Sequence, residues 1–344
     1  MAKTRAQRQV YADLLDRYGR SVADAFFAAL DKIKAAASVQ RITAEIEAGN
    51  IEGALDELDI DPADFNDLLD HIRDAQKEGG KAAADEMPKR RPDGTALSIR
   101  YDGRAYNAET WMREHSSDFI TRTTSDMRAA SRASLADNLA KGRNPKSAAL
   151  DLIGRLNRVT GKREGGILGL SIPQEEAVRR AREELASADP AGLRNYLTRP
   201  RRNRQFDRSV TKAIREGRAL DPAIAANAIR GYSNKLLRYR GEVIGKHEAF
   251  SALAAGKQQA YEQAVTSGKV DAAVVVKTWK HFPNLEPRHQ HIAMSGRSVG
   301  LLESFVLPDG TVMQFPHDPK APVKHTAGCH CQADYEIDFL AGIT

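Results

Sequence analysis

Histidine and cysteine are concentrated in one stretch near the end of the 344-residue chain. Six of the nine histidines lie between His281 and His330, and both cysteines, Cys329 and Cys331, lie at the end of this stretch. These side chains are the usual ligands of structural zinc, which binds four of them in a tetrahedron. The stretch therefore predicts either a metal site or a pair of buried, reduced thiols beside a hydrogen-bonded histidine.

The C-x-C spacing of the cysteines is shorter than the C-x2-4-C spacing of zinc fingers. On an extended segment the two thiols would point to one side and the intervening His330 to the other. A metal would join the first and last parts of a small module that is short of core. The histidines that can supply the remaining ligands are His281, His289, His291, His325 and His330. We expect the ligands Cys329, Cys331, His291 and His289, with His281 or His325 as alternatives for the fourth position.

The segment Arg288-His289-Gln290-His291 allows two pairings of side chains. In a strand His289 and His291 share a face, whereas in a helix Arg288 and His291 share one. The flanking Pro283 and Pro287 are typical of a turn that enters a short helix, which favours the second pairing.

The same stretch contains no complete catalytic motif. It has no HExxH for a metalloprotease, and the chain has no G-x-S-x-G and no nucleotide-binding glycine loop. The arrangement of His281, Asn284 and His291 is loosely similar to that of HNH nucleases, but the gap between its elements is too short for their metal hairpin. We therefore predict no catalytic residue and no enzyme, with a metal-dependent, HNH-like nuclease or another hydrolase acting on DNA as the alternative.

Long helices must position this stretch. Apolar residues at three- and four-residue spacing predict helices over 5–37, 107–141 and 222–267, with shorter ones within 41–79 and over 173–187. After Gly268, VDAAVVVKTWKHF and QADYEIDFL predict strands, and SFVLPDGTVMQF predicts a β-hairpin. The expected fold class is mainly α, with long helices forming an elongated body and a small α+β C-terminal module containing the hairpin.

Breaks in this pattern give a linear division of the chain. We expect an N-terminal helical segment over 1–80, a linker over 81–106, a long-helix body over 107–268 and the α+β module over 269–344. The linker is placed where EMPKRRPDG interrupts the helical pattern.

Charge is unevenly distributed, although the whole chain carries only +6. Residues 45–70 hold ten acidic and no basic side chains, whereas residues 194–218 hold nine basic and two acidic ones, a net of 9 − 2 = +7. Arginine-rich segments of this kind contact phosphates, so a DNA interface is one interpretation. A solvated helix face, or contact with an acidic protein, is the other. The expected DNA-contacting residues are Arg199, Arg201, Arg202, Arg204 and Arg208.

The composition of the chain also indicates in which cellular compartment the protein folds. There is no apolar run of about 18 residues, so we expect no membrane span, and the charged start has no signal-peptide core. Two cysteines one residue apart give no disulfide framework, which favours a reducing compartment.

The order of motifs near the C-terminus resembles the phage Mu F-like minor head protein family, also called the phage head morphogenesis family. A short β segment ends in Trp, an acidic–Arg–x–x–His–x4–Gly element and a hairpin follow, and C-x-C lies near the end. The matching positions are Trp279, Glu286, Arg288, His291, Gly296, Phe305, Pro316, Cys329 and Cys331. Upstream, Arg240, Ile244, Gly256 and Tyr261 also fit. The resemblance covers residues 222–338, about a third of the chain.

Three departures from the family pattern are present. Gly245-Lys246-His247-Glu248 replaces Ala-Arg-Thr-Glu, Glu286 replaces Asp, and Cys-His-Cys replaces Cys-Arg-Cys.

The resemblance implies a low-copy protein inside the phage head, near the portal vertex, that is made in the host cytoplasm. It implies a role in head assembly and in DNA packaging or ejection, with no enzymatic activity. The implied partners are the portal protein, other head proteins and double-stranded genomic DNA, in an oligomer around the portal and without a membrane in the resting state. Structural zinc is the one cofactor that the residues suggest.

Overall fold

The computed structural model describes residues 5–282 and 287–339, which are mainly α-helical, as the periodicity predicted. Pro283, Asn284 and Glu286 lie outside the described residues. None of the described helices combines the length and the apolar composition that a membrane span requires. The helices are α1 (Arg5–Ala36), α2 (Val39–Glu47), α3 (Ile51–Asp56), α4 (Asn66–Glu86), α5 (Tyr106–Ala140), α6 (Pro145–Ile153), α7 (Ile172–Ala186), α8 (Pro190–Thr198), α9 (Asp207–Glu216), α10 (Pro222–Thr266), α11 (His289–Met294) and α12 (Val323–Thr326). The strands are β1 (Arg155–Leu156), β2 (Arg163–Glu164), β3 (Val275–Lys280), β4 (Ser298–Gly300), β5 (Phe305–Val306), β6 (Val312–Met313) and β7 (Gln332–Ile337).

The helix ends follow local sequence signals. Asn144 caps α6, because its side chain accepts a hydrogen bond from the backbone N–H of Ser147 at 3.1 Å. Ser171 and Gln174 form the capping box that opens α7, and the helix expected over 173–187 is confirmed. Gly268 adopts a φ of +69° just beyond the end of α10, a conformation that glycine reaches without steric cost.

The chain folds into two compact units made from discontinuous pieces. Unit 1 comprises residues 1–25, 67–118 and 242–344, and unit 2 comprises residues 26–66 and 119–241. The helices α1, α5 and α10 each contribute residues to both units. This division differs from the linear one expected from sequence, because helical periodicity marks where a helix lies but not which helices pack together.

Residues 81–106 are not a linker in this structure. The helix α4 continues to Glu86, and Met87, Leu97 and Ile99 are buried in an apolar cluster of unit 1 with Tyr261. The charged and proline-containing sequence between them is typical of an exposed connection, but its apolar side chains have a core to enter, and their burial holds the segment in place.

Two glycines of α10 permit close helix packing within unit 1. A Cβ atom at Gly256 would lie 1.9 Å from the carbonyl oxygen of Gln76 in α4, and one at Gly245 would lie 2.2 Å from the carbonyl oxygen of Gly19 in α1. Any side chain would therefore push the backbones apart. Gly256 weakens the helix locally, and this contact is the physical reason for its presence.

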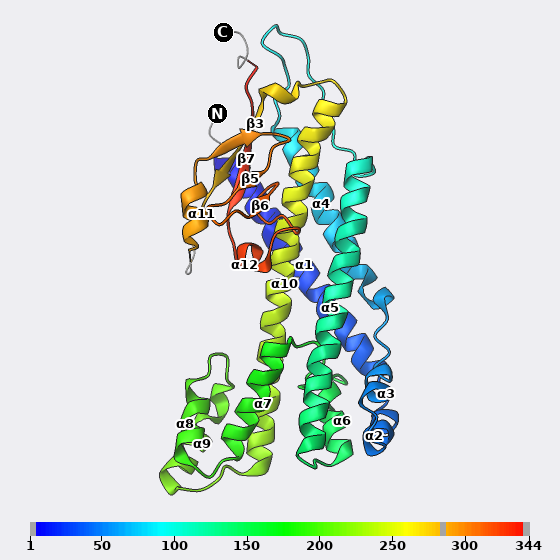
Figure 1. Cartoon of the computed structure of the whole chain (residues 1–344), viewed down its shortest axis with the longest axis vertical. Coiled ribbons are helices and arrows are strands. Elements are labelled where there is room, and N and C mark those ends of the chain that lie inside the picture. The colour runs from blue at the N-terminus through cyan, green and yellow to red at the C-terminus, as the bar shows by residue number, and fades with distance from the viewer. Residues whose placement is uncertain (1–4, 283–286, 340–344) are drawn as a thin grey trace. The chain divides into compact units, whose positions relative to one another are not determined.

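The C-terminal module of unit 1 contains the predicted strands. The central strand β3 pairs antiparallel with β4 on one side and β7 on the other, with Trp279 opposite Ala333. The strands β3 and β7 are drawn next to each other, in orange and red, in Figure 1. The predicted hairpin is present as β5 and β6, which pair Phe305 with Met313.

Unit 2 is a helical unit with one very short hairpin, β1–β2. The helix α2 packs against α3 and α6, and α8 packs against both α7 and α9. Lys34 of α1 is buried here and donates a hydrogen bond to the carbonyl oxygen of Gly165 at 3.2 Å. Burial lowers the pKa of this ammonium group to about 8.

Candidate metal centre

Trp279 is the residue around which the C-terminal motif folds. Its side chain is fully buried and meets the rings of His291 and Phe305 edge to face, each with a centroid separation of 5.3 Å. The backbone N–H of Gly296, which has a φ of +83°, donates to the carbonyl oxygen of Trp279 at 2.8 Å. Glycine is favoured in this turn because of that φ, and the turn holds α11 against β3.

The segment containing Arg288 and His291 forms the short helix α11, as the proline flanks predicted. Arg288 precedes the helix and donates from Nε to the carbonyl oxygen of Lys324 at 2.6 Å, and from Nη2 to the carbonyl oxygen of Ala327. His291 is buried, whereas His289 is exposed. Two residues correspond to about 200° of helix rotation, so His289 points away from the thiols and is not brought to the site expected for it.

The two cysteines alternate with His330 as an extended segment requires. Both are free thiols and are buried, while His330 between them is exposed. The Nδ1 atom of His291 lies 3.3 Å from Sγ of Cys329 and 3.6 Å from Sγ of Cys331. The three ligand atoms all lie within 4.8 Å of one another, so this cluster could hold a metal ion.

The two thiols interact strongly with each other. Hydrogen bonding with Cys331 holds the pKa of Cys329 well below its usual value. The same contact raises the pKa of Cys331, and burial adds to the effect. The pair therefore shares one proton. A divalent cation at this point would replace that proton and allow both sulfurs to bind as thiolates.

A chain of hydrogen bonds fixes the orientation of His291. Its Nε2 atom lies 3.3 Å from Nδ1 of His325, and Nε2 of His325 lies 2.9 Å from Oδ2 of Asp309 and 3.2 Å from the hydroxyl of Thr311. Hydrogen bonds from Lys324 and Thr311 hold the pKa of Asp309 well below its usual range, so its carboxylate is ionised.

An ionised Asp309 determines which nitrogen carries each proton. Asp309 accepts a hydrogen bond from the N–H at Nε2 of His325. The unprotonated Nδ1 of His325 then accepts a hydrogen bond from the N–H at Nε2 of His291. The Nδ1 atom of His291 is then unprotonated, and its lone pair faces the sulfurs. A histidine that binds a metal needs this protonation state. His325 is thus a positioning residue on the far side of the His291 ring and does not take the ligand position suggested for it.

His281, the other residue suggested for the fourth ligand position, lies near one of the two thiols. Its Nδ1 atom lies 3.5 Å from Sγ of Cys331, and its ring is partly exposed directly after β3. The sequence interpretation missed Asp309, Thr311 and His317. The first two belong to the hairpin turn. The Pro-Asp-Gly sequence there predicted a turn, and it gave no indication that Asp309 also contacts a histidine. His317 lies in the histidine-rich stretch from His281 to His330, but no motif or spacing in the sequence distinguished it from the other histidines.

The predicted DNA-contacting arginines divide into two groups in unit 2. Arg199 forms two hydrogen bonds with the carboxylate of Glu184, at 2.5 and 2.7 Å, and Arg202 forms two with Asp207, at 3.0 and 2.9 Å. These two arginines are therefore already paired with carboxylates of their own unit. The exposed members are Arg201, Arg204 and Arg208, and Arg201 also lies 3.5 Å from the ring centroid of Tyr239.

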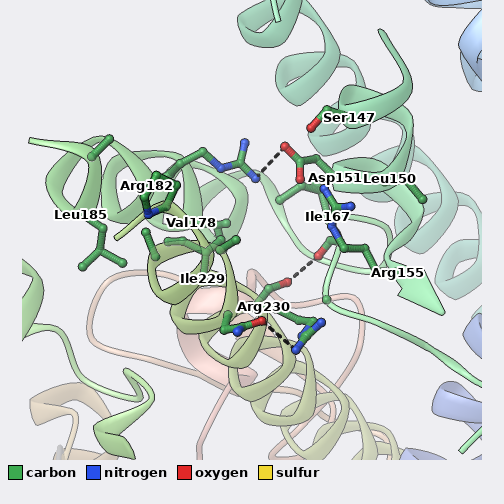
Figure 2. Close-up of a pocket in the computed structure, with 18 of the residues that line it drawn as sticks. Ser147, Leu150, Asp151, Arg155, Ile167, Val178, Arg182, Leu185, Ile229 and Arg230 are labelled. Atoms are coloured by element: carbon green, nitrogen blue, oxygen red, sulfur yellow. Dashed lines mark hydrogen bonds and ion pairs between the residues drawn. The ribbon is translucent and has the colours of Figure 1, made fainter. Parts of the chain in front are cut away.

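A separate pocket of about 390 Å³ also lies in unit 2. Arg182 of α7 reaches the carboxylate of Asp151 in α6 at 3.2 Å, and Arg143 reaches the same carboxylate at 3.1 Å. Figure 2 shows Arg182 pointing toward Asp151, with Ile229 and Arg230 of α10 below them. Two of the arginines that line the pocket, Arg143 and Arg182, therefore form ion pairs with the same carboxylate, and the pair with Arg182 joins α6 to α7.

In comparisons with protein-family models, with curated proteins and with solved structures, no match to this chain was found.

Proposed function

We propose that this protein is a minor structural component of a phage head that attaches near the portal and assists head assembly and DNA packaging or ejection. One observation supports this most strongly. Five of the residues on which the family resemblance rests are buried close together, although they are spread over more than 50 residues of sequence: Trp279, His291, Phe305, Cys329 and Cys331. Trp279, Cys329 and Cys331 share one apolar cluster, and His291 packs on Trp279 beside both thiols.

We assign zinc to this centre and a structural role to the metal. His291 belongs to α11, whereas Cys329 and Cys331 directly precede β7. One ion bound to all three would therefore fix the helix to the strand. Zinc bound in this way stabilises small modules that bury little apolar surface.

The chemistry of the site favours a connector over an enzyme. Both thiols and His291 are buried. The two nitrogens of His291 are already engaged, one toward the thiols and one with His325. A catalytic site needs a group that can reach substrate, and no described contact favours the nuclease alternative.

The exposed arginines of unit 2 support contact with packaged DNA. Arg201, Arg204 and Arg208 lie within ten residues of one another and are exposed. Guanidinium groups at such spacing bind phosphates without reading sequence, which suits a protein that must handle a whole genome. The other partners proposed are the portal protein and further head proteins, with several copies arranged around the portal.

The virion role is tested on particles purified from induced cells that carry this gene in its natural genome. Mass spectrometry should find the protein in DNA-filled heads at a copy number far below that of the major capsid protein. A deletion strain should yield fewer infectious particles, restored by the wild-type gene but not by the Cys329→Ser/Cys331→Ser variant. Particles that lack the protein, with an unchanged titre in the deletion strain, would overturn the proposal.

The metal assignment has its own test. Elemental analysis of freshly purified full-length protein, prepared without chelator, should find about one zinc per chain. The Cys329→Ser/Cys331→Ser variant should bind none. Wild-type protein that contains no zinc and does not bind added zinc would contradict the metal assignment. The virion role would then be tested by the particle experiment alone.

A further inference from the structure

The pocket of unit 2 combines apolar walls with an excess of positive charge. Its volume of about 390 Å³ lies within the range of about 300–1,000 Å³ that is typical of small-molecule sites. Four arginines and two carboxylates line it, which gives a net charge of 4 − 2 = +2. These charged residues are Arg143, Arg155, Arg182, Arg230, Asp151 and Glu164. The lining therefore favours an anion over a cation.

One carboxylate serves two of the guanidinium groups. Asp151 lies 3.1 Å from Arg143 and 3.2 Å from Arg182. The side chain of Arg182 is only 19% exposed, and burial lowers the pKa of its guanidinium group from the usual value. Two positive charges that share one negative charge leave an uncompensated cation where water solvates it poorly. A bound anion would compensate it.

The other two arginines add charge that no carboxylate balances. Within the part of the chain that the structure describes, neither Arg155 nor Arg230 forms an ion pair, and Arg230 donates from Nη2 to the amide oxygen of Asn227 at 2.9 Å. Glu164 lies opposite Arg155 in the β1–β2 register, but its carboxylate accepts from the side-chain amide of Asn157 at 2.6 Å. Both guanidinium groups are thus available to a ligand.

Apolar side chains form another part of the lining. Val178 and Leu185 of α7 and Ile229 of α10 are 1%, 0% and 7% exposed. Figure 2 draws these three side chains on one side of the view and Arg155 on the other. An inorganic anion would leave this apolar wall without a partner, and a neutral apolar molecule would leave the arginines uncompensated. A ligand with an anionic head and an apolar body satisfies both.

Glycine allows one wall of the pocket to come close to its neighbours. Gly165 and Gly166 line the pocket and have φ values of +75° and +82°. A Cβ atom at Gly166 would lie 2.5 Å from the backbone nitrogen of Gly154, and one at Gly165 would lie 2.8 Å from Cγ of Arg230. A side chain at either position would therefore force this wall away from its neighbours.

Hydrogen bonds hold the same wall in place. The N–H of Gly165 donates to Oδ1 of Asn234 at 2.6 Å, and its carbonyl oxygen accepts from the buried Lys34 at 3.2 Å. The carbonyl oxygen of Gly166 accepts from the hydroxyl of Ser233. Side chains of α1 and α10 thus fix this backbone, and the pocket is formed before any ligand enters, as is usual for small-molecule sites.

We propose that this pocket binds a small organic anion, a carboxylate or phosphate monoester attached to an apolar body. The guanidinium groups of Arg182 and Arg230 hold the anionic head, because arginine matches the oxygens of both head groups. The apolar body packs on Val178, Leu185 and Ile229. This inference goes beyond the proposed head function and does not depend on it.

Isothermal titration calorimetry of the full-length protein tests the proposal with probes that share one alkyl chain. Octanoate and octyl phosphate carry an anionic head, octan-1-ol carries a neutral one, and inorganic phosphate lacks the chain. We expect at least one of the two anionic probes to bind about tenfold more tightly than octan-1-ol and than inorganic phosphate. The tighter of the two identifies the head group.

Methionine variants locate the binding site, since methionine keeps an unbranched side chain and removes the charge. Arg182→Met and Arg230→Met should each weaken binding of the preferred probe by about tenfold. Arg180→Met is the matched control, because Arg180 lies on the same helix as Arg182, pairs with Glu176 and does not line the pocket. Its affinity should equal that of the wild type. Arg230→Met decides the test if Arg182→Met does not fold.

Four results would overturn the proposal. The first is that neither anionic probe binds. The second is that octan-1-ol or inorganic phosphate binds as tightly as they do, because either the charge or the apolar wall would then be irrelevant. The third is unchanged affinity in Arg182→Met and Arg230→Met, and the fourth is an equal loss in Arg180→Met. The particle and zinc experiments are unaffected by all four, so the proposed function is tested separately.

Discussion

Replacing Asp309 by asparagine should weaken metal binding by reversing the proton order of the histidine chain. In the wild type the carboxylate accepts from Nε2 of His325 at 2.9 Å, and His325 accepts from Nε2 of His291. Asparagine can turn its NH₂ group toward His325. The protons then move to Nδ1 of His325 and Nδ1 of His291, and the nitrogen that faces the thiols is no longer available to a metal.

The expected magnitude follows from the position of Asp309 as an outer partner of a ligand. Loss of such a partner usually lowers metal affinity by about 10- to 100-fold, or about 1.4–2.7 kcal/mol. Asp309→Ala only removes the partner, so it should fall in that range. Asp309→Asn also opposes the required tautomer, so its zinc affinity should be lower still. The turn itself should survive in Asp309→Asn, because the side-chain oxygen can still accept from the N–H of Thr311.

Competition of the protein with a chromophoric chelator for zinc measures this effect. Asp271→Asn is the matched control, since Asp271 caps the short turn before β3 by accepting from the N–H of Ala273 at 2.9 Å and takes no described part in the chain to His291. Circular dichroism should show equal helix content in all variants. Zinc affinities of Asp309→Asn and Asp271→Asn that agree with each other would refute the chain of hydrogen bonds as a determinant of metal binding.

Three further outcomes follow from the packing and the charges. Gly256→Ala should lower the free energy of unfolding by about 1–3 kcal/mol, because its Cβ would clash with a backbone carbonyl at 1.9 Å. Gly19→Ala, whose Cβ would make an ordinary 3.6 Å contact, should be neutral or stabilise by up to about 1 kcal/mol, and equal losses in denaturant titrations would contradict the close packing. Lys34 has a pKa of about 8 in the folded chain and an ordinary value of 10.5, so the unfolded chain binds more protons between these values and stability rises with pH there. Relative to Lys34→Met, wild-type stability should increase by about 2 kcal/mol from about pH 7 to about pH 9.5, and a difference independent of pH would show that the ammonium is not desolvated. Finally, Arg204→Ala/Arg208→Ala should reduce the slope of log affinity for DNA against log salt by about 2 without changing the melting temperature, whereas a slope equal to that of the wild type would place DNA elsewhere.

Local signals in the sequence were sufficient to predict most elements. The long helices, the capping box at Ser171 and the hairpin after Phe305 all follow from residues within one or two turns of each other. The alternation of Cys329 and Cys331 about His330, and the helical pairing of Arg288 with His291, are local in the same sense. Each depends on backbone periodicity, which adjacent residues determine.

The contacts between distant segments were decided only by the tertiary structure. Asp309 reaches His291 through His325, although nothing in the spacing of these residues indicates this contact. The same holds for the burial of Met87, Leu97 and Ile99 where a linker was expected.

The residue types of the candidate metal centre could thus be predicted from the sequence. Which of the six histidines between His281 and His330 contribute to it could not. Periodicity fixes the face on which a side chain lies, but the partner of that face depends on how helices and strands pack. The packing excludes His289, places His325 behind His291 and leaves His317 buried without a partner. Burial and hydrogen bonding between segments tens of residues apart therefore decide which imidazoles face the thiols.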